Sequence, residues 1–417
     1  MEKSEQIRQT MRETSEKRKG QVCRVFELKI IENKLNRATK EIFDRIFLEA
    51  KWLYNHWLAQ ENIFDLSDKI TEVKVKVGDK YETRELVFLS SQMKQSILDQ
   101  LKQNIFNLAK KKKSGSNIGR LKFKSFYRSI NLKQFDNTYK ISGNYIRIQG
   151  IKQWLRVNGM EQTEGYEFSN AKFISKPSGY YLNVTCYREK QKPIKQKAKP
   201  DIGIDFGVKT QLTLSNGIEV NYAIEATKRM RRYCAQASNK TLSSRKRWKA
   251  NERLRKEYEH LNNIKKDITN KVVHILHNEA NIISYQNDNI RGWQRIWGRR
   301  MFNTRLGGIK AGLKQIPTSV EVETFFPSTK QCPECQHKQN VSLDERIFVC
   351  ECCGFTRHRD WKSAEMIRDE GLLKIGVERT KLTPVESLAS TQRILRRLNA
   401  VSNVRASLLV EAGSPLL

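Results

Sequence analysis

The chain has 417 residues and carries 78 Lys and Arg against 45 Asp and Glu, a formal net charge of +33. This length exceeds the usual size of one hydrophobic core, so two to four domains are expected. The charge excess favours a polyanionic partner, because cationic contacts release the counterions condensed on a nucleic acid. A membrane protein is not expected, since no apolar run approaches the roughly 20 residues that span a bilayer, and no secretory segment precedes the charged start. Unpaired Cys23, Cys186 and Cys234 fit a reducing, cytoplasmic and nucleoid-associated location.

The first third of the chain predicts a polar start, a strand and two helices. Residues 1–20 are almost wholly polar, which predicts a tail or a solvated helix. Residues 22–31 alternate apolar and polar side chains as a strand does, and residues 33–58 place apolar residues at three- and four-residue spacing as a helix does. Residues 70–88 predict a hairpin that turns at Gly78, and a helix follows to about residue 108.

A basic segment follows this helix. The lysine run ends in a Ser-Gly-Ser-Asn loop and leads into residues 119–128, where cations alternate with aromatic side chains. A lysine run is often only a solvated helix face, but cations beside aromatics can hold phosphates and stack bases. The candidate nucleic-acid contacts here are Lys110, Lys111, Lys112, Lys113, Arg120, Lys122 and Lys124.

Short strands with turn residues between them are predicted from residue 129 to residue 187. Together with the strand at 22–31 they indicate a small β-barrel into which the helical segment is inserted. Residues 189–200 carry charge and proline but no apolar pattern, so they are interpreted as a linker.

An aspartate stands in the first strand after this linker. Asp205 lies in an otherwise apolar run, and a tight hairpin through Ser215, Asn216 and Gly217 follows. A carboxylate in a buried strand is costly unless it is hydrogen-bonded or holds a cation, which makes Asp205 a metal-ligand candidate. The alternative is an aspartate that simply closes the hairpin.

Residues 223–280 are helical in pattern and very basic, and a break near Asn239 predicts two antiparallel helices that form a cationic arm. A short strand ending at Gln286 follows, then a loop at 287–293, a helix near 301–315 and a strand at 319–326. The arm residues expected to contact nucleic acid are Arg245, Lys246 and Arg247.

Two CxxC pairs, fourteen residues apart, carry the strongest local signal. Four thiolates at this spacing converge tetrahedrally on one structural zinc ion. Disulfides or buried free thiols are the alternative. Cys352 lies inside the second pair and is taken as a bystander, with an exchange of roles with Cys353 left open. The expected zinc ligands are Cys332, Cys335, Cys350 and Cys353, and Asp360 follows them at the start of a predicted helix.

This order of motifs resembles the RuvC-like nuclease domain of the transposon-encoded TnpB proteins, which are related to the compact type V CRISPR effectors. The resemblance rests on residues 204–207, 327–332, the zinc ribbon, 358–364 and 405–415. It extends to Tyr54 and Asn55 and to residues 119–125, so Tyr54 and Asn55 join the candidate nucleic-acid contacts, although helical packing is the simpler role for Tyr54. It implies an RNA-guided endonuclease that binds a structured guide RNA and cleaves matched double-stranded DNA beside a short motif.

The implied fold is a multidomain α+β protein, with a small β-barrel, an inserted helical recognition domain, and a RuvC-like (RNase H fold) α/β nuclease domain that carries an inserted zinc ribbon. The implied boundaries are a polar tail at 1–20, the barrel at 21–31 and 119–188, the helical domain at 32–118, the linker at 189–200, the nuclease domain at 201–326 and 355–380, the ribbon at 327–354 and a C-terminal tail at 381–417.

The resemblance also implies three acidic residues around two Mg²⁺ ions. Asp205 and Asp360 fill two positions, but Gln286 stands where the family has glutamate. An amide keeps the shape and loses a ligand charge, so the chain is expected to be catalytically inactive. Asp288 could point the same way from an extended chain but is not expected to replace the glutamate.

Two explanations of Gln286 remain, an inactivation made to trap a complex and a naturally nuclease-dead RNA-guided DNA-binding repressor. A guide-free zinc-ribbon DNA-binding transposition protein is the rival class, and co-purifying RNA would separate it from the guided ones. The sequence leaves open the origin of the guide RNA, the target-adjacent motif and the oligomeric state.

Overall fold

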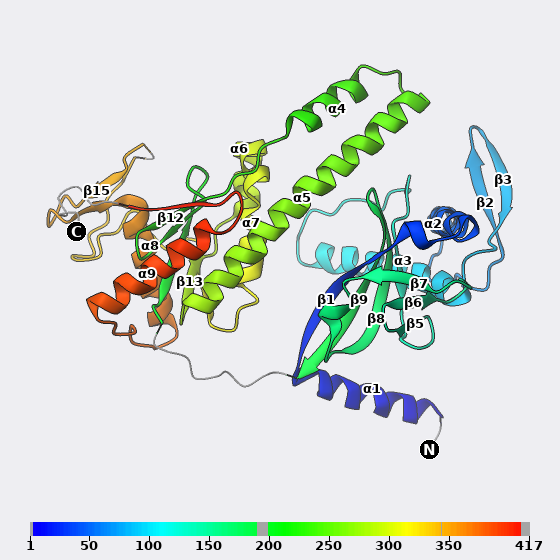
Figure 1. Ribbon diagram of the computed structural model, residues 1–417, viewed down its shortest axis with the longest axis horizontal. Coiled ribbons are helices and arrows are strands. Elements are labelled where there is room, and N and C mark those ends of the chain that lie inside the picture. Colours follow the sequence, from blue (N-terminus) through cyan, green and yellow to red (C-terminus); the bar gives the residue numbers. More distant parts are fainter. Residues whose placement is uncertain (1–2, 190–198, 343, 410–417) are drawn as a thin grey trace. The chain divides into compact units, whose positions relative to one another are not determined.

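The computed structural model describes residues 3–189, 199–342 and 344–409. It divides into two compact units, residues 1–193 and 194–417, and each is described by itself (Figure 1). The predicted linker falls almost wholly outside the described residues.

The first unit is built on a seven-stranded sheet whose paired strands all run antiparallel. The sheet curls until it is nearly closed, and the Tyr139 hydroxyl near one end donates a hydrogen bond of 2.7 Å to the Ser169 carbonyl near the other. The predicted small barrel is therefore present as a nearly closed sheet. Its strands, in spatial order, are β4 (Ser129–Leu132), β8 (Glu167–Lys176), β9 (Gly179–Glu189), β1 (Gln21–Ile30), β7 (Leu155–Asn158), β6 (Tyr145–Ile148) and β5 (Tyr139–Ser142).

Two long helices lie on this sheet. Asn36 caps the first by accepting a hydrogen bond from the Thr39 N–H, and Ser90 caps the second in the same way. Their apolar faces share one continuous core with the sheet, so the helical segment predicted as an inserted domain has no separate core of its own. The elements are α1 (Lys3–Lys19), η1 (Glu32–Lys34), α2 (Arg37–Leu58), the hairpin β2 (Glu72–Val77) and β3 (Lys80–Glu85), α3 (Ser91–Lys113) and η2 (Met160–Thr163).

The second unit contains a six-stranded mixed sheet. In spatial order its strands are β14 (Ser319–Val322), β13 (Ile283–Gln286), β10 (Ile202–Phe206), β11 (Leu212–Leu214), β12 (Ile218–Asn221) and β17 (Arg405–Leu408). The central strand β10 pairs in parallel with β13 and in antiparallel fashion with β11. The helices are α4 (Lys228–Ser238), α5 (Arg245–Glu279), α6 (Ile290–Thr304), α7 (Leu306–Leu313), α8 (Arg359–Lys374) and α9 (Pro384–Asn399).

Helix α8 lies against the central strand β10 because Gly203 allows close approach. A Cβ atom at Gly203 would lie 1.9 Å from the Ala364 carbonyl oxygen, so any larger residue would push the helix away. This contact fixes the start of α8 beside the carboxyl end of β10, and thus brings Asp360 towards Asp205.

The C-terminal segment differs from the predicted tail. Residues 384–399 form helix α9, and residues 405–408 form the edge strand β17, which pairs with β12. The Thr383 side chain and Glu386 form a capping box at the start of α9, and Ile394 and Leu398 are fully buried. The tail prediction was therefore wrong for residues 384–408, where a Thr-x-x-Glu cap starts a helix with buried apolar side chains and an edge strand follows.

The segment after β13 also differs from the prediction. Helix α6 begins at Ile290, so the loop expected at 287–293 is shorter, and strand β14 ends at Val322 instead of 326. Asn289 caps α6 by accepting a hydrogen bond from the Gly292 N–H.

Among the described residues, no helix combines the length and the apolar composition needed to cross a membrane.

Candidate functional site

A cavity of about 1080 Å³ lies at the carboxyl ends of β10 and β13. Asp205 enters it from β10, Gln286 from β13 and Asp360 from the first turn of α8. The three predicted catalytic residues therefore line one cavity although they are far apart in the sequence. Asp288 lines the same cavity.

Asp205 is buried in this cavity near two other carboxylates. Its pKa is raised well above the ordinary value, first by burial and then by the charges of Asp360 and Asp288. Arg359 and the Phe206 backbone N–H oppose this shift. An ionised Asp205 is thus costly without a further cation, so the site favours cation binding.

Asp360 is held by two arginines. The Arg359 Nε donates to one carboxylate oxygen at 3.0 Å, and the Arg346 guanidinium donates to the other at 3.2 Å. Arg346 precedes the second CxxC pair, so the cysteine-rich segment contacts the cavity directly.

The side-chain amide of Gln286 is fully engaged, and only 6% of the residue is exposed. Its Nε2 donates to the Thr324 carbonyl at 3.1 Å and to the Phe326 carbonyl at 2.8 Å. Its Oε1 accepts a hydrogen bond of 3.0 Å from the Ser328 hydroxyl. A glutamate has no proton on this atom at neutral pH and could not donate to the two carbonyls.

Asp288 is half-buried and faces the same cavity. Burial raises its pKa to about 6, and Lys310 opposes the shift. In the part of the chain that the structure describes, no hydrogen bond or ion pair engages its carboxylate.

The four predicted zinc ligands form one cluster whose sulfur atoms all lie within 4.8 Å of one another. The Cys332 and Cys353 sulfurs are 3.6 Å apart, and those of Cys335 and Cys350 are 3.5 Å apart. Tetrahedral zinc with bonds of about 2.3 Å would separate its sulfurs by about 3.8 Å, so the cluster is compatible with a structural zinc ion. All four cysteines are free, which contradicts the disulfide alternative. Cys352, which was predicted to be a bystander, is not in the cluster.

The cysteine-rich segment has almost no core of its own. It contributes the short hairpin of β15 (Ile347–Val349) and β16 (Thr356–His358). Its buried apolar cluster consists of Cys332, Phe348 and Cys350. A bound metal is therefore expected to supply most of its folding free energy.

A buried lysine joins this segment to α8, and sequence reasoning missed it. The Lys362 ammonium donates to the Thr329 carbonyl at 2.9 Å and to the Gln331 carbonyl at 2.8 Å, and it lies 3.8 Å from the centre of the Phe348 ring. Burial lowers its pKa to about 8. The only available signal was a lysine two residues after Asp360, inside the 358–364 segment that carries the family resemblance.

Three of the candidate nucleic-acid contacts in the first unit take part in packing within it. Tyr54 is only 2% exposed, so its ring is not available to nucleic acid, as the packing alternative held. The Asn55 side chain pairs with the backbone of Lys124 through hydrogen bonds of 2.9 and 2.8 Å. The Lys124 ammonium lies 3.9 Å from the centre of the Tyr54 ring. Together they fasten the segment 119–128 to α2.

The remaining candidates of this unit are open to solvent. Lys110, Lys111, Lys112 and Lys113 form the exposed last turn of α3, and Arg120 and Lys122 are also exposed. Phe123 is 65% exposed and Phe126 52% exposed. Exposed aromatics among cations can stack bases while the cations hold phosphates.

In the second unit, α4 and α5 form the predicted antiparallel arm, which projects beyond the sheet (Figure 1). Arg245 and Lys246 are exposed at the start of α5. Arg247 donates a hydrogen bond of 2.8 Å to the Lys240 carbonyl and closes the turn between the helices. Arg247 is therefore partly structural.

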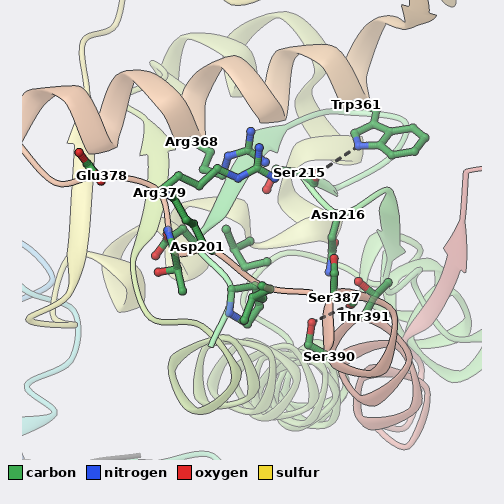
Figure 2. Close-up of a pocket in the computed structure, with 15 residues that line it drawn as sticks. Asp201, Ser215, Asn216, Trp361, Arg368, Glu378, Arg379, Ser387, Ser390 and Thr391 are labelled. Atoms are coloured by element: carbon green, nitrogen blue, oxygen red, sulfur yellow. Dashed lines mark hydrogen bonds between the residues drawn. The ribbon is translucent and has the colours of Figure 1, made fainter. Parts of the chain in front are cut away.

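A second cavity, of about 670 Å³, lies at the other end of β10. Figure 2 shows the Trp361 indole pointing towards Ser215, whose carbonyl accepts its N–H at 3.1 Å. The Asp201 carboxylate accepts the backbone N–H of Thr380 at 2.7 Å. The first contact joins α8 to the turn between β11 and β12, and the second attaches the segment before α9.

Residues 309–367 match the family model described as Cas12f1-like, TNB domain. The predicted likeness to TnpB and the type V effectors is confirmed. This TNB segment of the TnpB-like chain includes the four clustered cysteines, Lys362 and Asp360.

Two solved structures are similar to this TnpB-like chain. In the cryo-EM structure of the Cas12f1–sgRNA–target DNA complex, the protein is 14% identical, with a TM-score of 0.46 over 84% of this chain and 99% of that one. In a cryo-EM structure of a CRISPR–Cas12f ternary complex, it is 16% identical, with a TM-score of 0.28 over 80% of this chain and 82% of that one. A comparison with curated proteins finds no match.

Proposed function

We propose that this chain is an RNA-guided DNA-binding protein of the TnpB and type V effector kind, with a metal-dependent DNA nuclease site in residues 194–417. The TNB match carries the proposal, because the matched segment contains both the cysteine cluster and Asp360. Asp360 shares one cavity with Asp205, which lies more than a hundred residues earlier in the sequence.

The sheet of the second unit supports a RuvC-like (RNase H fold) domain. Its first three strands, β10, β11 and β12, are consecutive and antiparallel, and β13 and β14 then add in parallel on the other side of β10. Helix α8 packs on β10 and carries the last aspartate. Carboxylates from separate elements thus converge at one end of the sheet, as two-metal hydrolysis requires.

The charge distribution supports a guided mode of recognition. Of the two similar Cas12f structures, one is described as a complex with sgRNA and target DNA, and the other as a ternary complex. When base pairing with a guide reads the target, the protein needs to hold backbones and shape, which calls for diffuse cationic surface. The exposed lysines at the end of α3 and the exposed start of α5 offer such surface.

Magnesium would be held by Asp205 and Asp360 in this proposal. Their mutual repulsion fits a divalent cation between them. Among the described residues, no three acidic side chains bring their carboxylate oxygens within 4.8 Å of one another. Bound Mg²⁺ supplies an activated water and stabilises the leaving oxygen. Each Asp360 oxygen accepts one arginine hydrogen bond and keeps a further lone pair that an ion could use.

The test is purification of the full chain from cells that also transcribe the DNA flanking its gene. One structured RNA should co-purify, and the complex should bind DNA matched to the end of that RNA and ignore scrambled DNA. Purification without any defined RNA, with unchanged DNA binding, would favour the guide-free zinc-ribbon protein. Guided binding without cleavage at any Mg²⁺ concentration would favour the nuclease-dead repressor.

The arm gives a quantitative prediction. Changing Arg245 and Lys246 together to Gln should reduce the slope of log affinity against log salt by between about 1 and 2, if both side chains contact phosphates. Arg247 is left unchanged because it closes the α4–α5 turn. Filter-binding of the guide RNA at several salt concentrations measures the slope. The matched control replaces Arg8 and Arg12, which are exposed on α1; an equal change in both variants would mean that only total charge matters.

A further inference from the structure

We propose that Asp288, and not Gln286, supplies the third carboxylate of the Asp205 and Asp360 metal site, and that Gln286 is a positioning residue. The inference rests on the proposed nuclease function and identifies the ligand set of its site. It replaces the sequence-based expectation that Gln286 leaves the site one carboxylate short.

The Gln286 side chain is held in place by hydrogen bonds at both ends of its amide. Both N–H groups of its amide are used by the carbonyls of Thr324 and Phe326, and its oxygen accepts from Ser328. The residue is buried, so breaking these bonds would leave two carbonyls without partners. A side chain fixed in this way orients the chain between β14 and the first CxxC pair.

A glutamate at this position would disturb the same contacts. Its carboxylate would face two backbone carbonyl oxygens at the distances where the amide now donates, and only the bond from Ser328 would remain. The pocket around residue 286 is therefore built for an amide. An exchange for glutamate alone does not recreate a ligand in this chain.

Asp288 is held by its backbone while its side chain is left open. The Asn287 N–H donates to the Val322 carbonyl at 2.9 Å, which extends the β13–β14 pairing by one residue. The Lys310 ammonium donates to the Asp288 carbonyl at 2.9 Å and also to the Asn287 side chain. The Asp288 carboxylate has no hydrogen-bond partner in the described parts of the chain and lines the cavity that holds Asp205 and Asp360.

Asp288 lies two residues after Gln286, and in an extended chain side chains two residues apart point to the same face. The carboxylate of Asp288 lies close enough to Asp205 to act on it electrostatically, as Asp360 does. Five carboxylates line the cavity, those of Asp205, Glu225, Asp288, Asp344 and Asp360, and of these Asp288 and Asp360 act on Asp205. These three carboxylates together carry the charge that a pair of divalent ions requires. The chain as written is then expected to cleave matched DNA with Mg²⁺.

Binding of Mn²⁺ alone to the full zinc-loaded chain tests the ligand set without any need for cleavage. Electron paramagnetic resonance of free Mn²⁺ gives the affinity of each variant. Asp205→Asn, Asp360→Asn and Asp288→Asn should each weaken binding by about tenfold or more. Gln286→Glu should not tighten it. Asp267→Asn, an exposed aspartate on α5 paired with Lys271, is the matched control and should bind as the unchanged chain does.

The outcomes separate this inference from the proposed function. If Asp205→Asn and Asp360→Asn weaken Mn²⁺ binding but Asp288→Asn does not, the inference fails and the nuclease site stands. If Gln286→Glu tightens binding at least tenfold, Gln286 is the ligand position after all. If none of the three asparagine variants changes binding, the metal site itself is wrong.

A second measurement guards against misfolding of the Asp288→Asn variant. Fe²⁺ in place of Mn²⁺, with ascorbate and peroxide, cuts the polypeptide near a bound ion, and mass spectrometry locates the cuts. Cuts should appear near residues 205, 288 and 360 in the unchanged chain, and Asp288→Glu should retain them. Their absence near residue 288, with cuts at the other two positions, would overturn the proposal.

Discussion

Cys350→Ser is expected to reduce the zinc content of the purified protein from about one ion per chain to nearly none. Among the described residues, the buried apolar cluster around the four cysteines consists of Cys332, Phe348 and Cys350, with the partly buried Val341 and Phe355 packed against it. Three remaining ligands would therefore have too small a core to hold them in place. Elemental analysis measures the zinc. Limited proteolysis should then cut residues 328–358 much faster than in the unchanged protein, because the segment unfolds without its metal.

Cys352→Ser is the matched control for this experiment. Cys352 stands next to Cys353 in the same turn but outside the cluster, so its replacement should leave zinc content and protease resistance unchanged. Zinc retained in Cys350→Ser would contradict the assigned ligand set. Zinc lost in Cys352→Ser and kept in Cys353→Ser would mean that the two cysteines exchange roles.

Asp205→Asn is expected to have two effects of opposite sign. It should lower Mg²⁺-dependent cleavage by roughly a hundredfold or more, because the ion supplies several kcal/mol of transition-state stabilisation. In magnesium-free buffer it should raise the melting temperature, since burial and the neighbouring carboxylates make an ionised Asp205 unfavourable in the folded protein. Cleavage of matched DNA and calorimetry measure the two effects.

The pH dependence of this stability gain follows from the direction of the pKa shift. The pKa of Asp205 is raised on folding, so the folded state prefers the protonated acid while the unfolded chain ionises near its ordinary pKa of about 4. The carboxylate therefore destabilises the fold at pH values above its folded pKa and costs nothing below about pH 4. The gain from Asp205→Asn should be large at neutral pH and vanish near pH 4. A constant gain across this range, or a gain of equal size in Asp267→Asn, would contradict this origin.

Local spacing made several elements predictable from the sequence. The two CxxC pairs, the strand that carries Asp205 and the hairpin at residues 72–85 depend on patterns of a few residues, and the structure contains them. The C-terminal helix and edge strand were missed because the buried positions Ile394 and Leu398 lie in a segment rich in charge and serine.

The site itself depends on contacts that sequence patterns do not reveal. Asp205 and Asp360 line one cavity because Gly203 lets α8 lie directly on β10, and no local pattern predicts which helix covers a glycine. The same holds for Gln286, whose neighbours Thr324, Phe326 and Ser328 lie some forty residues away. Sequence reasoning compared Gln286 with a family position and could not see these partners.

The edge strand β17 has a consequence for synthesis of the chain on the ribosome. Strand β12 pairs with β11 on one side and with β17 on the other, and β17 follows β12 by more than 180 residues. During translation the outer edge of β12 therefore stays unpaired until this long intervening segment and β17 have been made. Unpaired edges invite pairing with other chains, so a nascent or truncated chain that stops before Arg405 carries an aggregation-prone edge that the finished protein covers.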